Sequence, residues 1–258
     1  MLSFDAETRK LLDVSYRGAD ITRRRMANMA ALAPAPGDTI LDLGCGQGLM
    51  TVELARAVGP EGTVMGVDPS ADMLEGARQT CAGQDNVRLI EGGAGALPVA
   101  DGALDAVVSL QVFEYIPDIP AALRDLQAKL KPGGRLVIGD MQWDTFSLAS
   151  DDPDRMAHMC RAWEQHVAAP DVPAQLPALL EAAGFRLIEM RPLPYVSVTL
   201  RPDGLAFMLL HLMRGYARDN DLMPEAEADA WFAEQERRAA EGRFFFALTH
   251  VIAIALRR

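Results

Sequence analysis

From Asp38 onward the sequence repeats one pattern: a short apolar run, a turn of glycine or aspartate, and a longer amphipathic stretch. The pattern is typical of strands and helices that alternate around a parallel sheet, because parallel strands need long crossover connections. The predicted strands cover residues 39–43, 63–67, 87–91, 104–110, 135–140, 185–191 and 244–256. The predicted helices cover residues 49–58, 71–82, 119–130 and 173–183, and Pro and Gly in LKPGGR (130–135) predict a sharp stop before the fifth strand.

Two segments lie outside this pattern. Residues 1–33 predict a helical cap at the N-terminus, and residues 195–243 insert a mostly helical stretch before the last strand. We expect one domain over residues 1–258, with a ligand-binding core at 34–194 and the last strand at 244–258. Ligands of open α/β sheets bind at the carboxyl ends of the strands, so the insertion is a candidate lid over the substrate.

The charge balance excludes one class of partner. Acidic residues outnumber lysine and arginine 36 to 25, which gives a formal net charge of −11. Such a chain repels phosphate backbones, so we expect no nucleic-acid partner. The three cysteines, Cys45, Cys81 and Cys160, form no C-x-x-C pair, and no metal site is predicted.

The N-terminal stretch has no uninterrupted apolar region, and the longest apolar run, 205–213, is less than half a membrane span. We therefore expect a cytoplasmic protein with no stable membrane insertion. The sequence leaves its assembly state open, with a homodimer among the alternatives.

The stretch LDLGCGQG at 41–48 carries three glycines at alternate positions, Gly44, Gly46 and Gly48. A dinucleotide fingerprint G-x-G-x-x-G would need its third glycine at Leu49, and a Walker loop would need a lysine that is absent. The turn therefore lacks a phosphate anchor. About twenty residues further on, Asp68 ends the second strand in GVDPS, where an acidic side chain can accept hydrogen bonds from a ribose.

Four segments, LDLGCGQG, GVDPSADML, LPVADGALDAVVSLQVFEYIPD and LKPGGRLVIGD, together resemble class I S-adenosylmethionine-dependent methyltransferases. The resemblance is strong over residues 36–141 and is closest to the small-molecule branch that includes the ubiquinone and menaquinone C-methyltransferases. It implies a Rossmann-like, seven-stranded, mostly parallel sheet with an antiparallel last strand and helices on both faces. It also implies S-adenosyl-L-methionine as methyl donor and a small-molecule acceptor.

The resemblance further implies which residues surround the donor. Residues of the glycine turn would hold its methionine part, the end of the second strand its ribose, and Met73 its adenine, while an N-terminal tyrosine would cover it. The family often has an acidic residue where this chain has Gly93, with Glu91 two residues upstream. The implied donor-binding residues are Tyr16, Asp42, Gly44, Cys45, Gly46, Asp68, Pro69, Met73, Gly93, Ala94 and Gln111.

Methyl transfer from a sulfonium is an in-line displacement, and a base is needed only when the acceptor arrives protonated. Residues after the fourth and fifth strands should face the acceptor, which makes Tyr115, Asp140 and Trp143 catalytic candidates beside Gln111, Glu114, Gln142 and Asp144. Among the histidines, His211 in the insertion is a further candidate. His158 and His166 have a spacing that fits no metal signature, and His250 is expected to be structural.

The insertion carries apolar residues at helical spacing, at positions 205, 208, 209, 212 and 213. Such stripes usually pack in the core, but at the place of a substrate lid some of them are expected to line an acceptor pocket, which indicates an apolar or aromatic acceptor. Arg23, Arg24 and Arg25 point in different directions on a helix and are expected to be mainly solvated. Two other classes stay open at this point, a nicotinamide-dependent oxidoreductase and a non-catalytic donor-binding protein. Arsenite methylation is disfavoured because only Cys45 would lie in the cleft.

Overall fold

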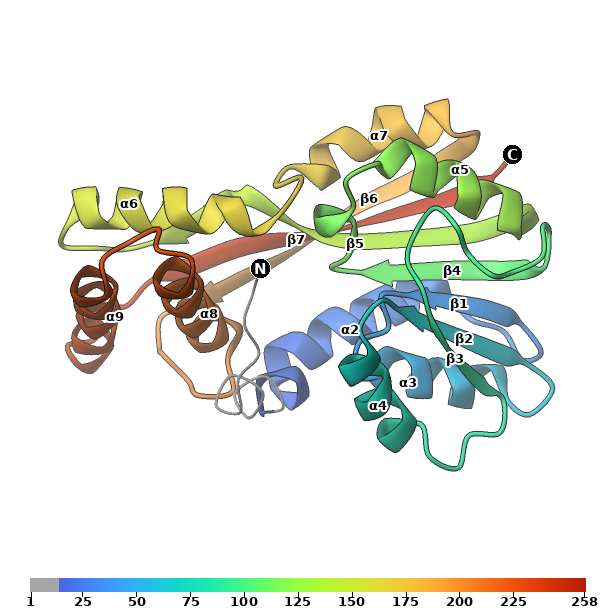
Figure 1. Cartoon of the computed structure of the whole chain (residues 1–258), viewed down its shortest axis with the longest axis horizontal. Helices are drawn as coiled ribbons and strands as arrows, with labels where there is room; N and C mark the ends of the chain where they lie inside the picture. Colours follow the sequence, from blue (N-terminus) through green and yellow to red (C-terminus); the bar gives the residue numbers. More distant parts are fainter. Residues whose placement is uncertain (1–13) are drawn as a thin grey trace. The chain divides into compact units, whose positions relative to one another are not determined.

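The structure is a computed structural model that describes residues 14–258. A seven-stranded sheet runs through it in the order β3-β2-β1-β4-β5-β7-β6 (Figure 1). The sheet is mostly parallel with an antiparallel β7, which confirms the predicted Rossmann-like class. The strands are β1 (Thr39–Leu43), β2 (Thr63–Asp68), β3 (Val87–Glu91), β4 (Leu104–Leu110), β5 (Leu130–Leu148), β6 (Phe185–Ser197) and β7 (Phe246–Arg257).

The first strand lies between β2 and β4 and is parallel to both. Leu41 is paired with Met65 of β2 on one side and with Val107 of β4 on the other. The chain continues outward from β1 to β2 and β3, and then returns to the other side of β1 with β4 and β5. The strand order therefore reverses between β1 and β4, which in open α/β sheets is where ligands bind.

Helices connect the strands. They are α2 (Ala19–Leu32), α3 (Leu49–Val58), α4 (Ala71–Thr80), α5 (Ile119–Lys129), α6 (Pro153–Trp163), α7 (Val172–Ala182), α8 (Leu205–Asp219) and α9 (Glu225–Ala240), with short 3-10 turns η1 (Phe113–Tyr115) and η2 (Glu164–His166). The side chains of Ser70 and Asp118 cap the N-termini of α4 and α5 by accepting backbone N–H groups, as short polar side chains do at this position.

The chain divides into two compact units. The unit called here the sheet unit comprises Arg25–Gln142, Asp171–Leu193 and His250–Arg258. The helical unit comprises Trp143–Pro170, Pro194–Thr249 and, of the described residues, also 14–24. The expectation of a single domain over 1–258 stays a prediction, and the part of the predicted N-terminal cap at 1–13 lies outside the described residues.

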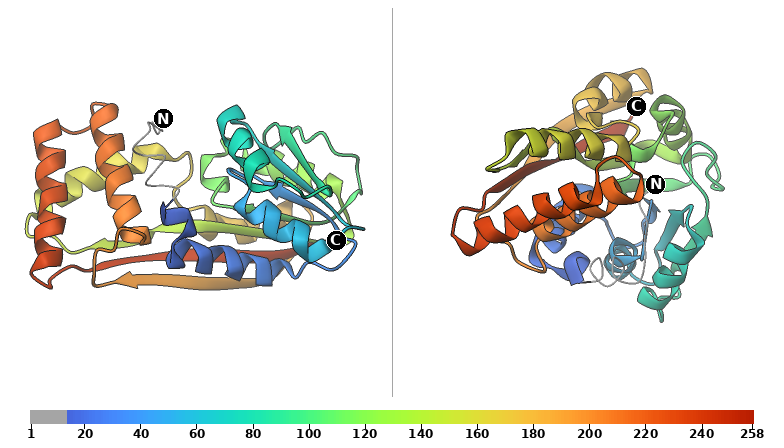
Figure 2. Two further views of the ribbon diagram at one scale, coloured as in Figure 1. Left: turned by 90° about the horizontal axis from the view of Figure 1, so that it is seen from below. Right: turned by 60° about the vertical axis from the view of Figure 1, so that its left-hand side comes forward.

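The sheet unit is built around strands that are buried on both faces. Every residue of β1 after Thr39 is buried, and α3 lays its apolar face on this layer through Met50, Leu54 and Val58. Their spacing of four residues puts them on one side of the helix. Helices α3 and α4 lie on one face of the sheet, and α5 and α7 on the other (Figures 1 and 2). Both faces are thereby shielded from water, as a parallel sheet requires.

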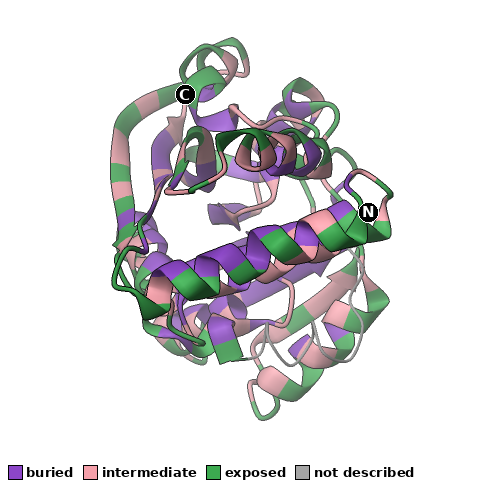
Figure 3. Cartoon of the chain, turned by 90° about the vertical axis from the view of Figure 1, so that its left-hand side faces the viewer, coloured by how far each residue is buried: buried purple, intermediate pink, exposed green. Residues whose placement is uncertain are grey.

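In the helical unit, α6, α8 and α9 pack against one another. The predicted apolar stripe of α8 forms much of this contact, since Leu205, Met208, Leu209 and Met213 are all buried. The ribbon coloured by burial shows such alternation of buried and exposed stripes on the helices (Figure 3). Asp20 holds the start of α8, because its carboxylate Oδ2 accepts the backbone N–H of Leu205 at 3.0 Å and faces Arg201 at 3.1 Å.

The structure differs from the sequence-based prediction at β5. This strand begins at Leu130 and continues to Leu148, whereas the sequence predicted residues 135–140. The LKPGGR segment is not a stop before the strand but lies within β5. It shifts the register of β5 against β4, since Leu104 is paired with Leu130 while Ala106 is already paired with Arg135. Its proline and its Gly133, with φ 75°, form a bulge, because a proline lacks the N–H that the ladder needs.

Helix α6 is not one of the four helices predicted between the strands, but its second half covers His158 and Trp163, where the sequence makes a helix plausible. The predicted helical character of 195–243 is confirmed by α8 and α9. Within residues 14–258, no helix is both long and apolar enough to cross a membrane.

A substitution at Gly139 on β5 would test how tightly the sheet unit is packed. A Cβ at this position would lie 2.3 Å from Asn28 Oδ1 and 2.6 Å from His250 Nε2, two fully buried side chains whose nitrogens are 3.1 Å apart. We expect Gly139→Ala to lower the free energy of unfolding by about 1 to 3 kcal/mol, since the packed pair must move. Urea unfolding followed by circular dichroism measures this change.

The matched control is Gly215→Ala on α8, where a Cβ would meet no atom within 4 Å. This substitution should raise stability by about 0.5 to 1 kcal/mol, because alanine loses less backbone entropy than glycine in a helix. Equal effects of the two substitutions would contradict the packing argument.

Candidate active site

The glycine turn follows β1 in the sheet unit. Gly44, Gly46 and Gly48 all have positive φ, at 73°, 53° and 77°. A Cβ on Gly44 would lie 2.2 Å from Val112 Cγ2, and one on Gly48 would lie 3.1 Å from Ala77. Two of these glycines are therefore needed both for the backbone conformation and for close packing. At Gly46 no atom lies within 4 Å of a Cβ, so that position faces open space.

Asp68 connects this turn to the end of β2. Its Oδ2 accepts the N–H of Gly46 at 2.9 Å, and its Oδ1 accepts the N–H of Ser70 at 2.9 Å. The carbonyl of Val67 accepts the N–H groups of Gly44 and Cys45 at 2.7 and 3.0 Å. A carboxylate offers about four acceptor positions, so Asp68 retains the capacity to bind hydroxyl groups.

Asp42 lies under the turn and is 1% exposed. Thr51 on α3 donates its hydroxyl to Asp42 Oδ2 at 2.6 Å. Burial raises the pKa of Asp42 to about 7, against the opposing effect of the Thr51 hydrogen bond, and the nearby Asp68 adds to the rise. The sequence placed Asp42 in the site but gave no indication of its partner Thr51, because a single threonine in a helix carries no motif.

The other residues predicted to bind the methyl donor follow β2 and β3. Met73 is half-buried and its N–H is donated to the Ser70 hydroxyl at 3.3 Å. Gly93 and Ala94 come after the end of β3 at Glu91, which is paired with Asp68. A Cβ on Gly93 would meet no atom within 4 Å. The strand register thus brings the Asp68, Gly93 and Glu91 segments to one edge of the sheet, as predicted.

Further residues that the sequence predicts to face the donor or the acceptor lie at the ends of β4 and β5. Gln111 has φ 59°, which is unusual for a residue with a side chain, and its N–H is donated to Gly139 O at 2.7 Å. Tyr115 is 42% exposed, whereas Asp140 and Glu114 are both fully buried. The sequence predicted their positions at the strand ends but not the burial of both acids.

In the helical unit, Trp143 belongs to an aromatic cluster with Trp163, His166 and Tyr216. The Trp143 ring centroid is 5.8 Å from that of Trp163 and 5.1 Å from that of His166, and His166 stacks on Trp163 at 3.6 Å. Burial lowers the pKa of His166 to about 4, so its imidazole is neutral at neutral pH. Tyr216 donates its hydroxyl to Gln165 O at 2.8 Å.

The indole nitrogen of Trp163 is buried and has no hydrogen-bond partner among residues 14–258. The DMQWD segment predicted Trp143 as a site residue. Tyr216 was not predicted, because it comes from α8, far along the chain, and carries no local signal.

Several other candidate residues are packed against neighbouring side chains. His211 lies between the rings of Phe207 and Phe232, at centroid distances of 4.2 and 4.5 Å, and its Nδ1 is 3.0 Å from Phe207 O. The burial of the α8 stripe shows packing between helices rather than an open wall. Tyr16 lies in the helical unit, and its role over the donor stays a prediction. His250 is buried in β7 beside Asn28, in agreement with the expected structural role.

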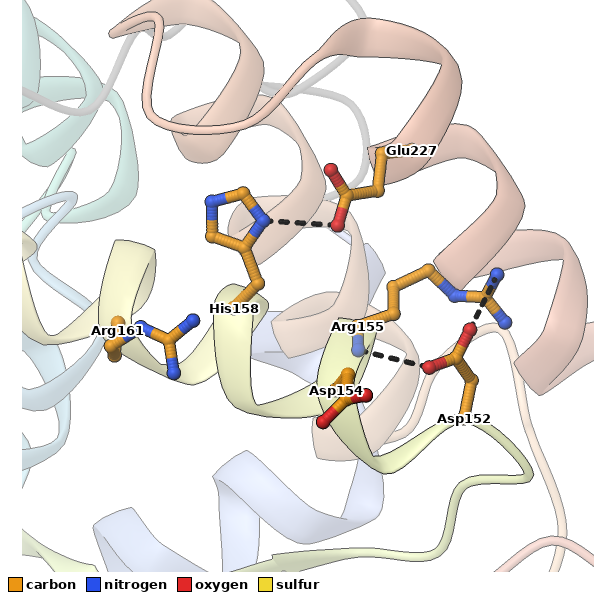
Figure 4. A pocket seen from close by; sticks show the side chains of 6 residues that line it. All are labelled: Asp152, Asp154, Arg155, His158, Arg161 and Glu227. Carbon is orange, nitrogen blue, oxygen red and sulfur yellow. Dashed lines mark hydrogen bonds and ion pairs between the residues drawn. The ribbon is translucent and has the colours of Figure 1, made fainter.

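A polar hollow of about 520 Å³ lies on the helical unit (Figure 4). Its charged side chains are largely paired, since His158 Nδ1 is 2.9 Å from Glu227 Oε1 and Arg155 is 3.3 Å from Asp152 and also contacts Glu234. The His158–Glu227 and Arg155–Glu234 pairs connect α6 to α9. Over the described part of the chain, no group of His, Cys, Asp and Glu side chains is arranged to hold a metal ion.

Comparison with known proteins matches the amino-acid sequence of this chain to a family. A model described as a methyltransferase domain matches residues 34–184. The chain is 36% identical over 180 residues to an arsenite methyltransferase of Halobacterium salinarum, covering 68% of this chain and 44% of the relative. It is 36% identical over 124 residues to a demethylmenaquinone methyltransferase of Staphylococcus aureus, covering 48% of this chain and 51% of the relative. The chain thus spans about half the length of these curated relatives.

Among solved structures, the YcgJ protein of Bacillus subtilis superimposes with a TM-score of 0.62 at 20% identity, covering 92% of this chain and 99% of that one. At this identity the likeness supports the fold alone. The strand order with an antiparallel β7 is that of the Rossmann-like methyltransferases.

This chain belongs to the class I S-adenosylmethionine-dependent methyltransferase family. Membership of this family, whose methyl donor is S-adenosylmethionine, decides against the oxidoreductase alternative.

The buried Asp42 makes stability depend on pH. Its pKa rises from 3.8 to about 7 on folding, so between these values the folded protein holds a proton that the unfolded chain releases. Stability should therefore fall as pH rises from about 4 to about 7, and the cost, of the order of 4 kcal/mol, then persists at higher pH. We expect Asp42→Asn, measured by chemical unfolding without donor, to be more stable than the wild type at pH 8.

At pH 4 most of the advantage of Asp42→Asn should disappear, because this pH is close to the unfolded-state pKa of 3.8 and the unfolded chain then gains little free energy by releasing the proton. Thr51→Val is the matched comparison: it removes the hydrogen bond that lowers the pKa of Asp42 and should extend the fall in stability to higher pH. Parallel stability curves of wild type and Asp42→Asn would show that Asp42 is not the titrating group.

Proposed function

We propose that the enzyme transfers the methyl group of S-adenosylmethionine to a small, uncharged, apolar or aromatic acceptor. The donor's methionine part would be held by the glycine turn with Asp42, its ribose by Asp68 and Pro69, and its adenine by Met73 and the segment at Gly93 and Ala94. Gln111 would close the cleft from the end of β4.

The described geometry of the sheet unit fits such a donor. The Asp68 carboxylate keeps acceptor capacity at the end of β2, and Gly46 leaves open space next to it. The turn offers no lysine and no third dinucleotide glycine for a phosphate. A buried acid, Asp42, lies beneath the turn and can balance a positively charged group. These features favour a nucleoside that carries a cationic amino-acid chain.

The aromatic cluster at Trp143 carries the proposal for the acceptor. It combines two indoles, a phenol and an imidazole that is neutral at physiological pH. Trp163 and Tyr216 are buried, so Trp143 and His166 are the rings that can present an uncharged aromatic surface to a ligand. Aromatic rings bind aromatic or apolar partners through edge and face contacts. One relative is named for demethylmenaquinone, which supports an acceptor of this general kind.

Arsenite, named for the other relative, is less well supported as the acceptor. Cys45 is buried in the glycine turn, and burial raises the pKa of its thiol, so it is a poor thiolate ligand. Cys81 is buried at the end of α4, and Cys160 lies on α6 of the other unit.

The donor supplies a methyl group on a positively charged sulfur, which is a good leaving group. The residues of the chain then have to orient donor and acceptor in line and exclude water, a contribution of about 7 to 11 kcal/mol in well-oriented systems. No acid or base acts directly on the methyl group, so the specificity of the enzyme depends on the residues that hold the acceptor.

The role of Asp68 is tested by donor binding. We expect Asp68→Asn to weaken S-adenosylmethionine binding by about 10- to 100-fold, because an amide has only one accepting oxygen and cannot accept both hydrogen bonds that now come from Gly46 and Ser70. Isothermal titration calorimetry gives the dissociation constant.

The control is Asp72→Asn, an exposed acid in the first turn of α4. It changes the charge by the same amount and should leave donor affinity within about twofold, because exposed charges contribute little. If both variants bind the donor as the wild type does, Asp68 does not hold the ribose.

The acceptor class is tested with methyl-labelled donor and cell extract. After reaction, we expect the label in the organic-extractable small-molecule fraction. Label in the protein fraction, or only in polar aqueous metabolites, would contradict an apolar or aromatic acceptor.

With the acceptor in hand, Trp143→Ala should lower kcat/KM by about 10-fold or more with donor affinity unchanged, because it removes an aromatic contact and loosens the wall. Trp143→Phe should recover most of this loss. Phe245→Ala, an aromatic of the same unit that is 40% exposed and outside the cluster, is the control and should have the wild-type value.

A further inference from the structure

A hydroxyl group and a carboxylate are buried against each other beneath the glycine turn of the sheet unit. Thr51, in the first turn of α3, is fully buried, and Asp42 on β1 is 1% exposed. The Thr51 hydroxyl group donates a hydrogen bond to Asp42 Oδ2 at 2.6 Å. A hydroxyl group donates to an ionised carboxylate over about 2.5 to 2.7 Å, a shorter range than between neutral groups. The distance therefore fits a charged Asp42.

The place of Thr51 on α3 is otherwise apolar. Its spacing puts it on the same side of the helix as Leu54 and Val58, which belong to the core of the sheet unit. A threonine in a helix can bond its hydroxyl group to a carbonyl of the preceding turn, but here the hydroxyl group reaches Asp42 on the strand instead. A valine would serve the packing of this side equally well, so packing does not account for the hydroxyl group.

The charges around Asp42 come from several elements. Its strand neighbours on β2 and β4 are uncharged. At the end of β2, the carboxylate of Asp68 is close enough to act on Asp42. Burial raises the pKa of the Cys45 and Cys81 thiols, and Asp42 adds to both rises, while Arg56 on α3 acts on Cys81 in the opposite direction. The charge that acts on Asp42 itself is thus negative, and these surroundings favour a bound cation.

The hydrogen bond from Thr51 affects how easily Asp42 ionises. Burial raises the pKa of Asp42 to about 7, the Thr51 hydrogen bond opposes this rise, and Asp68 adds to it. At neutral pH, Asp42 is therefore near the midpoint of its titration. Loss of the hydrogen bond moves this midpoint to higher pH, because the charged form loses a donor.

The methyl donor carries two positive charges, an ammonium group on its methionine part and the sulfonium that holds the methyl group. The sulfonium charge is lost as the methyl group is transferred, so a carboxylate that stabilised this charge in the bound donor would slow the reaction. The ammonium group keeps its charge throughout and belongs to the part of the donor assigned to the glycine turn. A buried carboxylate beneath this turn suits the ammonium group.

We propose that Thr51 is a positioning residue of the donor site: its hydroxyl group holds Asp42 Oδ2 and keeps the carboxylate charged, so that Asp42 balances the ammonium group of the donor from beneath the glycine turn. The bond engages Oδ2, so Oδ1 remains as an acceptor. This role rests on the donor site proposed above, to which it adds a residue and a dependence on pH.

The proposal has a consequence for the pH profile of binding. Because the ionised form of Asp42 attracts the ammonium group, donor and proton compete, and wild-type affinity should rise from pH 6 to pH 8. Without the Thr51 hydroxyl group the rise should move to higher pH, so the loss of affinity is large at pH 7 and small at pH 9. A loosened turn would weaken binding equally at every pH.

The test uses S-adenosylhomocysteine, which keeps the ammonium group and lacks the sulfonium charge, in calorimetric titrations from pH 6 to pH 9. We expect Thr51→Val to bind it about 3- to 10-fold more weakly than the wild type at pH 7, the effect of one hydrogen bond to a charged group, and to approach wild-type affinity at pH 9. Thr51→Ser keeps the hydroxyl group and should restore the wild-type profile. Thr63→Val, at the opposite end of β2 from the site, is the control and should also keep this profile.

A second readout counts protons. Titrations in buffers of different ionisation enthalpy should show that the wild type releases about one proton per S-adenosylhomocysteine bound at pH 6, and that Asp42→Asn releases none. In the Asp42→Asn background, adding Thr51→Val should change affinity no further, because the two residues act as one unit. Methylthioadenosine, which lacks the amino-acid chain, should bind wild type and Thr51→Val equally.

The outcomes separate this role from the donor site as a whole. Equal losses at pH 7 and pH 9 in Thr51→Val, an equal loss for methylthioadenosine, or an unchanged profile would overturn the role of Thr51. If Thr51→Val does not fold, Thr51→Ala removes the same hydroxyl group and decides the outcome. If the wild type binds neither probe, or Asp68→Asn binds both as the wild type does, the proposed donor site is wrong.

Discussion

The parallel pairing of β1 with both β2 and β4 is the constraint on which the site depends. It brings the carboxyl ends of these strands to one edge, so that residues as far apart in the chain as Gly44 and Tyr115 follow strands that end there. The glycine turn, Asp68 and the Gln111 to Tyr115 segment all follow these strand ends. Because each strand is fixed by its buried apolar side chains, the turns beyond them can carry polar groups in unusual conformations.

Buried acids are the second feature of the sheet unit. Asp42 lies beneath the glycine turn with Thr51 as its partner, and Asp140 lies beneath η1 with Glu114. In both places burial favours the protonated form, at a position next to a segment assigned to the donor.

Much of the sheet could be predicted because its signals are local. The bounds of β1, β3, β4 and α3 agree with the sequence prediction at every residue, since apolar runs bounded by glycine, proline and aspartate define them. Prediction was less accurate where neighbouring strands decide the bounds. Strand β5 extends to Leu148 and β6 to Ser197, well past the predicted ends, because pairing along the sheet can extend a strand through residues with no clear alternation.

The sequence by itself determined the class of the protein: the spacing of Gly44, Gly46 and Asp68 and the order of four motifs were enough to indicate the fold and the donor. The tertiary structure decided the surroundings of each group. It showed that Thr51 donates a hydrogen bond to Asp42, that Val112 packs on Gly44, that Glu114 and Asp140 are both buried, and that Tyr216 contacts Trp163, which in turn contacts Trp143. These contacts join residues far apart in the chain, and burial, which sets the charge of an acid or a histidine, exists only once the chain has folded around it.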